Sequence, residues 1–194
     1  MEEIAKGAEA VLYREGDHLI KEREQKGYRH RELDSRLREE RTEMEKRLLE
    51  KARQAGVRVP SVEKESTFQL SMEEVDGELL KDVFEDKEEI WSSIGESVAR
   101  LHNRNVIHGD LTTSNMIVSG EQLYLIDFGL GFFSDRVEDC ATDIHLLKET
   151  LESTHPEIAE EAMQEIKKAY REESEDGDEV LERLSEIEER GRYK

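Results

Sequence analysis

Two short stretches of this chain decide its fold: His108-Gly109-Asp110-Leu111-Thr112-Thr113-Ser114-Asn115 and Asp127-Phe128-Gly129. Apolar runs at 116–118 and 123–126 lie between them, separated by Ser119-Gly120-Glu121-Gln122, and we expect a hairpin there. A loop followed by a hairpin brings the side chains of Asp110, Asn115 and Asp127 to one cleft. Carboxylate and amide oxygens suit Mg²⁺. The spacing therefore predicts a cleft that holds this metal.

The two stretches together match the catalytic loop of protein kinases, His-x-Asp-x-x-x-x-Asn followed by Asp-Phe-Gly. Either half alone would be weak, but both in this order, a hairpin apart, form a specific signal. By this resemblance Asp110 is the catalytic base that accepts or orients a substrate hydroxyl, and Asn115 and Asp127 are the Mg²⁺ ligands. We interpret His108 as a brace of the loop rather than as a proton carrier.

A kinase also needs a lysine on its third strand and a helix glutamate that holds it. Lys21 ends the strand-like run His18-Leu19-Ile20 and is our candidate, with Lys26 as the weaker one. Glu45, in the middle of a helix expected over 31–54, fits the partner role, and Glu43 is its rival.

The nucleotide-binding parts are less distinct. The segment before Asp76-Gly77 resembles an adenine hinge, where the backbones of Glu73 and Val75 would bond the base. The phosphate-covering loop, usually glycine-rich, is written here as Gly7, Ala8, Glu9 and Ala10, with one glycine. We take these residues, with Lys21, as the candidate ATP contacts.

The order of expected elements is strands, helix, strands, helix, hairpin and helices, which predicts an α+β chain with two lobes. We expect a small bilobal protein-kinase-like fold whose β-rich N-lobe carries one or two helices and whose helical C-lobe is truncated. The single domain 1–194 would divide into an N-lobe at 1–75, a C-lobe at 76–189 and a basic tail at 190–194.

Composition sets further bounds. The net charge is −20, yet residues 21–41 hold eight Lys or Arg against six Asp or Glu, whereas 149–189 hold four against sixteen. This acidity disfavours nucleic acid as the main ligand, although a basic patch can still touch phosphates. One cysteine excludes an internal disulfide, and no apolar run suggests a signal peptide or a membrane segment, so we expect a cytoplasmic protein with no membrane partner.

The whole chain resembles the atypical kinase subunit of the KEOPS complex, the PRPK-like kinases related to the RIO kinases. The most specific pieces are Gly7 to Ala10, Lys26-Gly27-Tyr28-Arg29, Arg41-Thr42 with Glu45, Gly56-Val57 with Val59-Pro60, the two stretches quoted first with Leu130, Ser153-Thr154-His155-Pro156, and Arg190-Gly191-Arg192.

This resemblance implies an ATP-dependent Ser/Thr kinase or ATPase that uses Mg²⁺, with Mn²⁺ as a substitute. It implies a role in threonylcarbamoyladenosine modification of tRNA. The partners would be a threonylcarbamoyltransferase subunit and a small regulatory subunit, with tRNA reached through the complex.

Three departures from ordinary protein kinases support this interpretation. Gly109 stands where His-Arg-Asp has the arginine that pairs with a phosphorylated activation loop, and Thr112 stands where Ser/Thr kinases carry a lysine. No Ala-Pro-Glu follows Asp127, and we expect a helix from near Asp143, which leaves no room for a long activation segment. We therefore predict slow or partner-dependent chemistry.

Two other functions stay open. His-Gly-Asp-x-x-x-x-Asn is also the loop of aminoglycoside and choline kinases, but these carry a substantial helical substrate lobe, and 67 residues follow Asp127 here. A catalytically weak scaffold is the third hypothesis, because the covering loop is poor in glycine, although Lys21, Asp110, Asn115 and Asp127 are all present.

Overall fold

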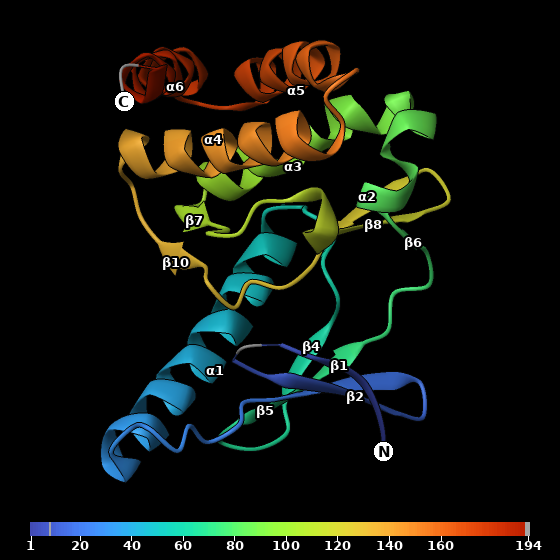
Figure 1. The fold of residues 1–194 in the computed structure, drawn as a ribbon, viewed down its shortest axis with the longest axis vertical. Coiled ribbons are helices and arrows are strands. Elements are labelled where there is room, and N and C mark those ends of the chain that lie inside the picture. Colours follow the sequence, from blue (N-terminus) through green and yellow to red (C-terminus); the bar gives the residue numbers. More distant parts are fainter. Residues whose placement is uncertain (8, 193–194) are drawn as a thin grey trace.

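The computed structural model describes residues 1–7 and 9–192, and these form a β-rich N-lobe below a helical C-lobe (Figure 1). The N-lobe is an antiparallel five-stranded sheet in the order β1-β2-β3-β5-β4. Gly16, at a φ of +67°, makes the tight turn between β2 and β3. The strands are β1 Glu2–Lys6, β2 Val11–Glu15, β3 His18–Glu22, β4 Val62–Lys64 and β5 Gln69–Glu73.

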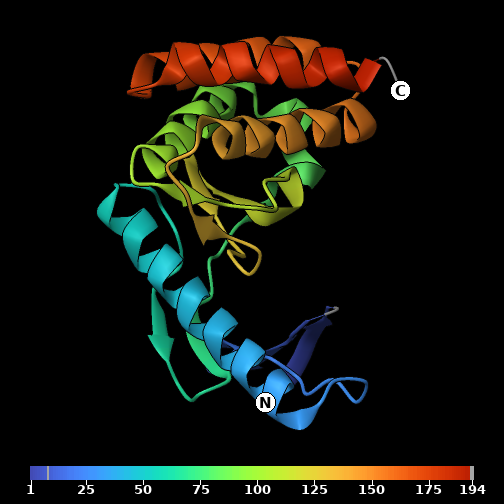
Figure 2. The same ribbon diagram turned by 90° about the vertical axis from the view of Figure 1, so that its left-hand side faces the viewer.

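One long helix, α1 Arg31–Gln54, runs from the sheet up to the C-lobe (Figure 2). Its buried residues Thr42, Glu45, Leu49 and Ala52 recur every three or four positions, as expected for a helix with one face inside the protein. The chain leaves the helix at Gly56, whose φ of +80° favours glycine. The expectation of one or two helices here resolves to a single helix.

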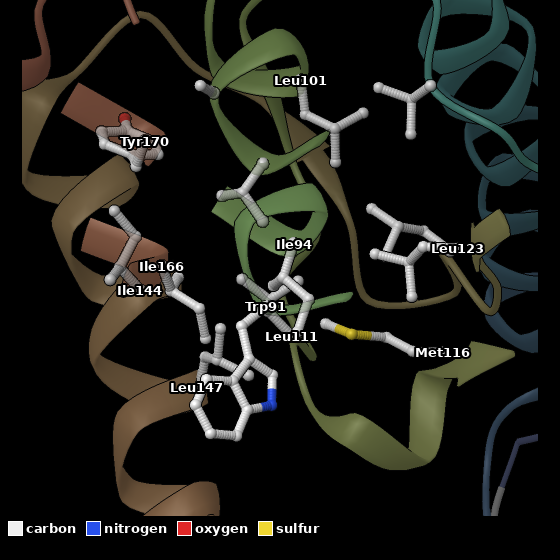
Figure 3. Close-up of a cluster of buried hydrophobic side chains, with 14 of the residues drawn as sticks. Trp91, Ile94, Leu101, Leu111, Met116, Leu123, Ile144, Leu147, Ile166 and Tyr170 are labelled. Atoms are coloured by element: carbon white, nitrogen blue, oxygen red, sulfur yellow. The ribbon is translucent and has the colours of Figure 1, made fainter. Parts of the chain in front are cut away.

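Helices build most of the C-lobe. Helix α3 crosses its centre and packs closely on α5, because Gly95 has no side chain: a Cβ there would come within 2.3 Å of the Ile166 carbonyl oxygen. Figure 3 shows the apolar core that these helices share with α4 and the hairpin. The helices are α2 Leu80–Val83, α3 Trp91–His102, α4 Val137–Thr154, α5 Ala159–Glu173 and α6 Gly177–Arg192.

Short strands in the C-lobe carry the catalytic loop. Strands β8 Met116–Ser119 and β9 Gln122–Leu125 form the expected hairpin, with β6 Glu78–Leu79 beside β8. Strand β7 Val106–Ile107 pairs with β10 Phe132–Phe133 just before the loop. Single 3₁₀ turns lie at Phe84–Asp86, Glu88–Ile90 and Thr113–Asn115.

The structure corrects the expected start of one helix. Helix α4 begins at Val137 and not near Asp143, because Val137, Cys140, Ala141 and Ile144 already share the helical apolar spacing. Helix α6 continues through Arg192, and the rest of the tail expected at 190–194, Tyr193 and Lys194, lies outside the described residues. Because α4 begins at Val137, the segment between Asp127 and the next helix is even shorter than expected.

Within the described residues, no helix combines the length and the apolar character needed to cross a membrane.

Candidate active site

A cavity of about 580 Å³ lies between the lobes. The sheet contributes apolar residues to one wall, the hairpin contributes to the opposite wall, and the catalytic loop forms the polar end. Most residues expected at a nucleotide site line this cavity, namely Gly7, Glu9, Ala10, Lys21, Glu45, Glu73, Val75, Asp110, Asn115 and Asp127. Ala8, the remaining one, lies outside the described residues.

Lys21 joins the two lobes. Its Nζ donates to Glu45 Oε1 at 2.5 Å and to Asp127 Oδ1 at 2.8 Å. Burial alone would lower the pKa of Lys21, but the two carboxylates outweigh burial and raise the pKa above 10.5. Lys21 therefore keeps its positive charge. Burial would likewise raise the pKa of Asp127, yet the Lys21 charge lowers it, so this side chain is a carboxylate and suited to a metal.

The structure also separates the rival candidates. Glu45 is 1% exposed and points at Lys21, whereas Glu43 pairs with Lys64 on the surface at 3.0 Å. The backbone N–H of Lys26 donates to Asp34 Oδ1 at 3.2 Å, beyond the end of β3, and Lys26 does not line the cavity. Helical phase explains the difference, because Thr42, Glu45 and Leu49 share the buried face of α1.

Sequence reasoning missed Arg23. This side chain is buried, lines the cavity, and donates from Nη2 to Glu45 Oε2 at 2.6 Å. Residues two apart in an extended chain point to the same side. The Lys-x-Arg spacing of Lys21 and Arg23 was therefore the signal that could have found it.

In the catalytic loop, Asn115 orients Asp110. Its Nδ2 donates to the Asp110 carbonyl and to Asp110 Oδ2, both at 2.8 Å. The Asn115 side-chain oxygen has no hydrogen bond among the described residues and is left to accept from or ligate something else. Asp127 has a φ of +58°, a left-handed backbone conformation that non-glycine residues adopt rarely and that clusters at active sites.

The ring of His108 braces the catalytic loop. Its Nδ1 accepts from the Asp110 N–H at 3.3 Å, and its Nε2 donates to the Ile126 carbonyl at 3.1 Å. Burial lowers the pKa of His108, which fits the neutral ring that these bonds require. The ring also contacts Phe128, with centroids 4.5 Å apart. His108 is therefore held between the two diagnostic motifs.

A buried network that the motifs did not predict anchors the loop to α4. Asp143 accepts the N–H groups of His108 and Gly109, each at 2.9 Å. His102 Nε2 lies 3.3 Å from Asp143 Oδ2, and its Nδ1 lies 2.9 Å from the hydroxyl of Tyr170, whose ring is labelled in Figure 3. Asp143 thus connects the chain beside Asp110 to the helical core.

The covering loop has one glycine, and ion pairs of Glu9 hold it in place. Gly7 N–H donates to the Ala10 carbonyl at 2.9 Å, which makes a tight turn. Glu9 Oε2 lies 2.7 Å from Arg41 Nη1 on α1, and Glu9 Oε1 lies 3.5 Å from Arg29. The loop is thereby connected to the helix that carries Glu45.

At the hinge, the Glu73 N–H donates to the Ser61 carbonyl at 2.9 Å, which holds this strand end in place. The Val75 N–H makes no backbone hydrogen bond within the described chain and can serve a ligand.

The residues present fit a magnesium ion bound together with phosphates. The described residues include no cluster of three or more His, Cys, Asp or Glu side chains that could hold a metal by themselves. Mg²⁺ in phosphate sites typically takes one or two protein oxygens besides phosphate oxygens and water. The Asp127 carboxylate and the free oxygen of Asn115 are such a pair.

Solved structures support the class that this geometry indicates. Rio2 kinase from Chaetomium thermophilum matches all of this chain and 74% of its own, with a TM-score of 0.65 at 15% identity. Amicoumacin kinase matches 89% of this chain and 72% of its own, with a TM-score of 0.62 at 15% identity. Such identities show the fold alone. The fold and the site together define a chain of the protein-kinase-like class.

Relatives narrow the class to a family. The family model "RIO domain" matches residues 8–131. The KEOPS complex subunit Bud32 of Pyrococcus abyssi is 41% identical over 213 residues, covering all of this chain and 97% of the relative. The chain belongs to this RIO-domain family of Bud32-like kinases.

Other relatives are longer. A probable bifunctional tRNA threonylcarbamoyladenosine biosynthesis protein of Methanosarcina mazei is 42% identical over 192 residues, which are 96% of this chain. The chain spans 35% of that relative's length.

Proposed function

We propose that this chain binds ATP with Mg²⁺ and transfers or hydrolyses the terminal phosphoryl group, as the atypical kinase or ATPase subunit of a KEOPS complex that makes threonylcarbamoyladenosine in tRNA. The observation that carries the proposal is the Glu45–Lys21–Asp127 chain of contacts, which faces Asp110 and Asn115 across one cavity. The names of the relatives from Pyrococcus and Methanosarcina support the cellular role.

Each side chain then has one task. The carbonyl of Glu73 and the N–H of Val75 hold the base, since the Glu73 N–H is bonded to Ser61. Lys21, oriented by Glu45, neutralises the phosphates. Asp127 and Asn115 hold Mg²⁺, with Mn²⁺ as a substitute, and the ion when bound neutralises charge on the phosphate oxygens. Asp110, oriented by Asn115, accepts the proton of the attacking hydroxyl or water.

The geometry favours a dedicated partner over free peptide substrates. Strand β10 follows Asp127 almost at once, and its exposed side chains Phe132 and Phe133 lie where longer kinases begin an activation segment. We propose a threonylcarbamoyltransferase subunit and a small regulatory subunit as partners, tRNA as a ligand of the assembled complex, and the cytoplasm as the compartment.

Turnover of ATP tests the proposal. We would measure phosphate release by the wild type, Asp127→Ala and the surface control Asp86→Asn, each alone and with a threonylcarbamoyltransferase subunit. The proposal expects partner-stimulated turnover in the wild type and the control, and its loss in Asp127→Ala. Turnover that depends on an amino sugar or choline would instead favour a small-molecule kinase. The absence of nucleotide binding would favour a scaffold.

A further inference from the structure

Arg23 is a second buried cation in the site, beside Lys21. Its side chain is 4% exposed, and its Nη2 lies 2.6 Å from Glu45 Oε2. A Cβ built on Gly129 would lie 3.3 Å from Lys21 Nζ and 3.5 Å from Arg23 Nη2, so both cations border the Asp-Phe-Gly turn. The kinase pattern used above assigns Glu45 a single cation, whereas this chain gives it two.

The two cations are held differently. Lys21 is shared between Glu45 and Asp127, so it has an alternative partner on the side of the cavity that would face phosphates. Arg23 has Glu45 as its one carboxylate partner in the described structure. A guanidinium stays protonated at every accessible pH and presents a planar fork that suits a carboxylate.

The backbone of Arg23 is also fixed to its surroundings. Its N–H donates to the Phe68 carbonyl at 3.0 Å, and its carbonyl accepts from Arg38 Nη1 at 3.1 Å. Arg38 is in turn bonded to the buried Asp34 at 2.8 Å, and its guanidinium lies 3.9 Å from the ring centre of Phe68. The end of β3 is therefore joined to α1 at two places, through Glu45 and through Arg38.

We propose that Arg23 is a positioning residue for phosphoryl transfer, one that holds Glu45, and α1 with it, against the cavity while Lys21 turns to the nucleotide phosphates. Glu45 has two oxygens and a separate cation for each, so Lys21 can shift without leaving a buried carboxylate unpaired. Helix α1 then stays packed against the cavity without needing a signal from an activation segment. This inference rests on the proposed function, because it assigns Lys21 to phosphates.

Enzyme kinetics test the idea with four variants: Arg23→Met, Arg23→Lys, Glu45→Gln and the double variant Arg23→Met/Glu45→Gln. The control is Arg36→Met, an exposed position on α1, the helix that carries Glu45. We expect Arg23→Met to lower kcat about tenfold with KM for ATP changed less than about threefold, and Arg23→Lys to recover most of the loss. Because Arg23 acts through Glu45, the double variant should match Glu45→Gln alone. If the kcat of the double variant falls by the product of the two single-variant factors, the proposal is overturned.

Amide exchange over residues 41–49 adds a readout that does not need turnover, and it covers the case in which Arg23→Met folds poorly. Faster exchange there in Arg23→Met and Arg23→Met/Glu45→Gln, but not in Arg36→Met, is the expected result. Exchange equal to that of wild type would contradict the hold on α1. A wild type that releases no phosphate would defeat the proposed function, while this exchange pattern would still report on Arg23 and Glu45.

Discussion

Two separate conditions require a glycine at the position of Gly109. Its φ is +76°, and a Cβ there would lie 2.4 Å from the Leu130 carbonyl oxygen. Gly109 therefore does more than replace the arginine that pairs with a phosphorylated activation loop in ordinary protein kinases. It allows the chain after Asp-Phe-Gly to pass directly over the catalytic loop, which is why the segment can be so short.

Gly109→Ala should abolish most turnover and lower the free energy of unfolding by about 3 kcal/mol, through backbone strain and the contact with Leu130. Gly120→Ala is the matched control, since Gly120 has a φ of +62° but nothing within 4 Å of its built Cβ. We expect the control to lose about 1 kcal/mol in urea unfolding and to keep its turnover. Equal losses in the two variants would show that the contact with Leu130 is unimportant.

The His102–Asp143 pair predicts how stability depends on pH. Burial disfavours the charged ring, but the bond to Asp143 raises the pKa of His102 well above 6.5. Burial likewise opposes the carboxylate, and the bond from His102 still lowers the pKa of Asp143 below 3.8. The stability from His102 is complete below pH 6.5 and declines as the pH rises toward its folded pKa, while that from Asp143 is complete above pH 3.8 and declines in acid.

Urea unfolding between pH 4 and pH 9 checks this expectation. The wild type should lose stability as the pH rises above about 6.5, and His102→Gln should lose this part of the slope. A His102→Gln profile parallel to that of wild type across this range would refute the charged pair.

At the scale of elements, the covering loop and α1 behave as one unit. Glu9 joins the loop to Arg41, which lies one turn before Glu45 on the same helix. A glycine-rich loop would instead reach the phosphates through a flexible backbone. In this chain the loop is positioned by the helix that also positions Lys21.

Removing the Glu9 charge should therefore release the loop. We expect Glu9→Gln to speed amide exchange at residues 9–12 about fivefold, a modest effect because the pair is one-third exposed. Glu39→Gln, on the exposed side of α1, should change nothing. Exchange at residues 9–12 that is unaffected by Glu9→Gln would show that the ion pair does not hold the loop.

Elements differ in how well the sequence predicts them. The catalytic loop and its hairpin are local, so the spacing of Asp110, Asn115 and Asp127 was enough to predict their shared cleft. Helical phase likewise singles out Glu45 over Glu43. Asp143 and His102 join the site through contacts between helices 41 positions apart, and no local pattern marks them. Strands β4 and β10 are two or three residues long and form by pairing with distant partners.

At the scale of the whole molecule, the acidic residues divide into a few in the interior and many on the surface. Few of the acidic residues are buried, and those few, including Glu45, Asp34 and Asp143, each accept hydrogen bonds. The acidic excess of the C-terminal half lies on the exposed faces of α5 and α6, away from the cavity. Two cations, Lys21 and Arg23, thus line the cavity of a protein of net charge −20.

The central claim is that Asp127 and Asn115 bind ATP through Mg²⁺ in the cavity between the lobes. Calorimetric titration of ATP into the wild type and Asp127→Ala, with Mg²⁺ and with chelator, tests it most directly. We predict one site in the wild type whose affinity falls about tenfold or more without Mg²⁺, and an affinity in Asp127→Ala that no longer responds to the metal. ATP binding that is absent from the wild type, or equal in all four titrations, would contradict the claim.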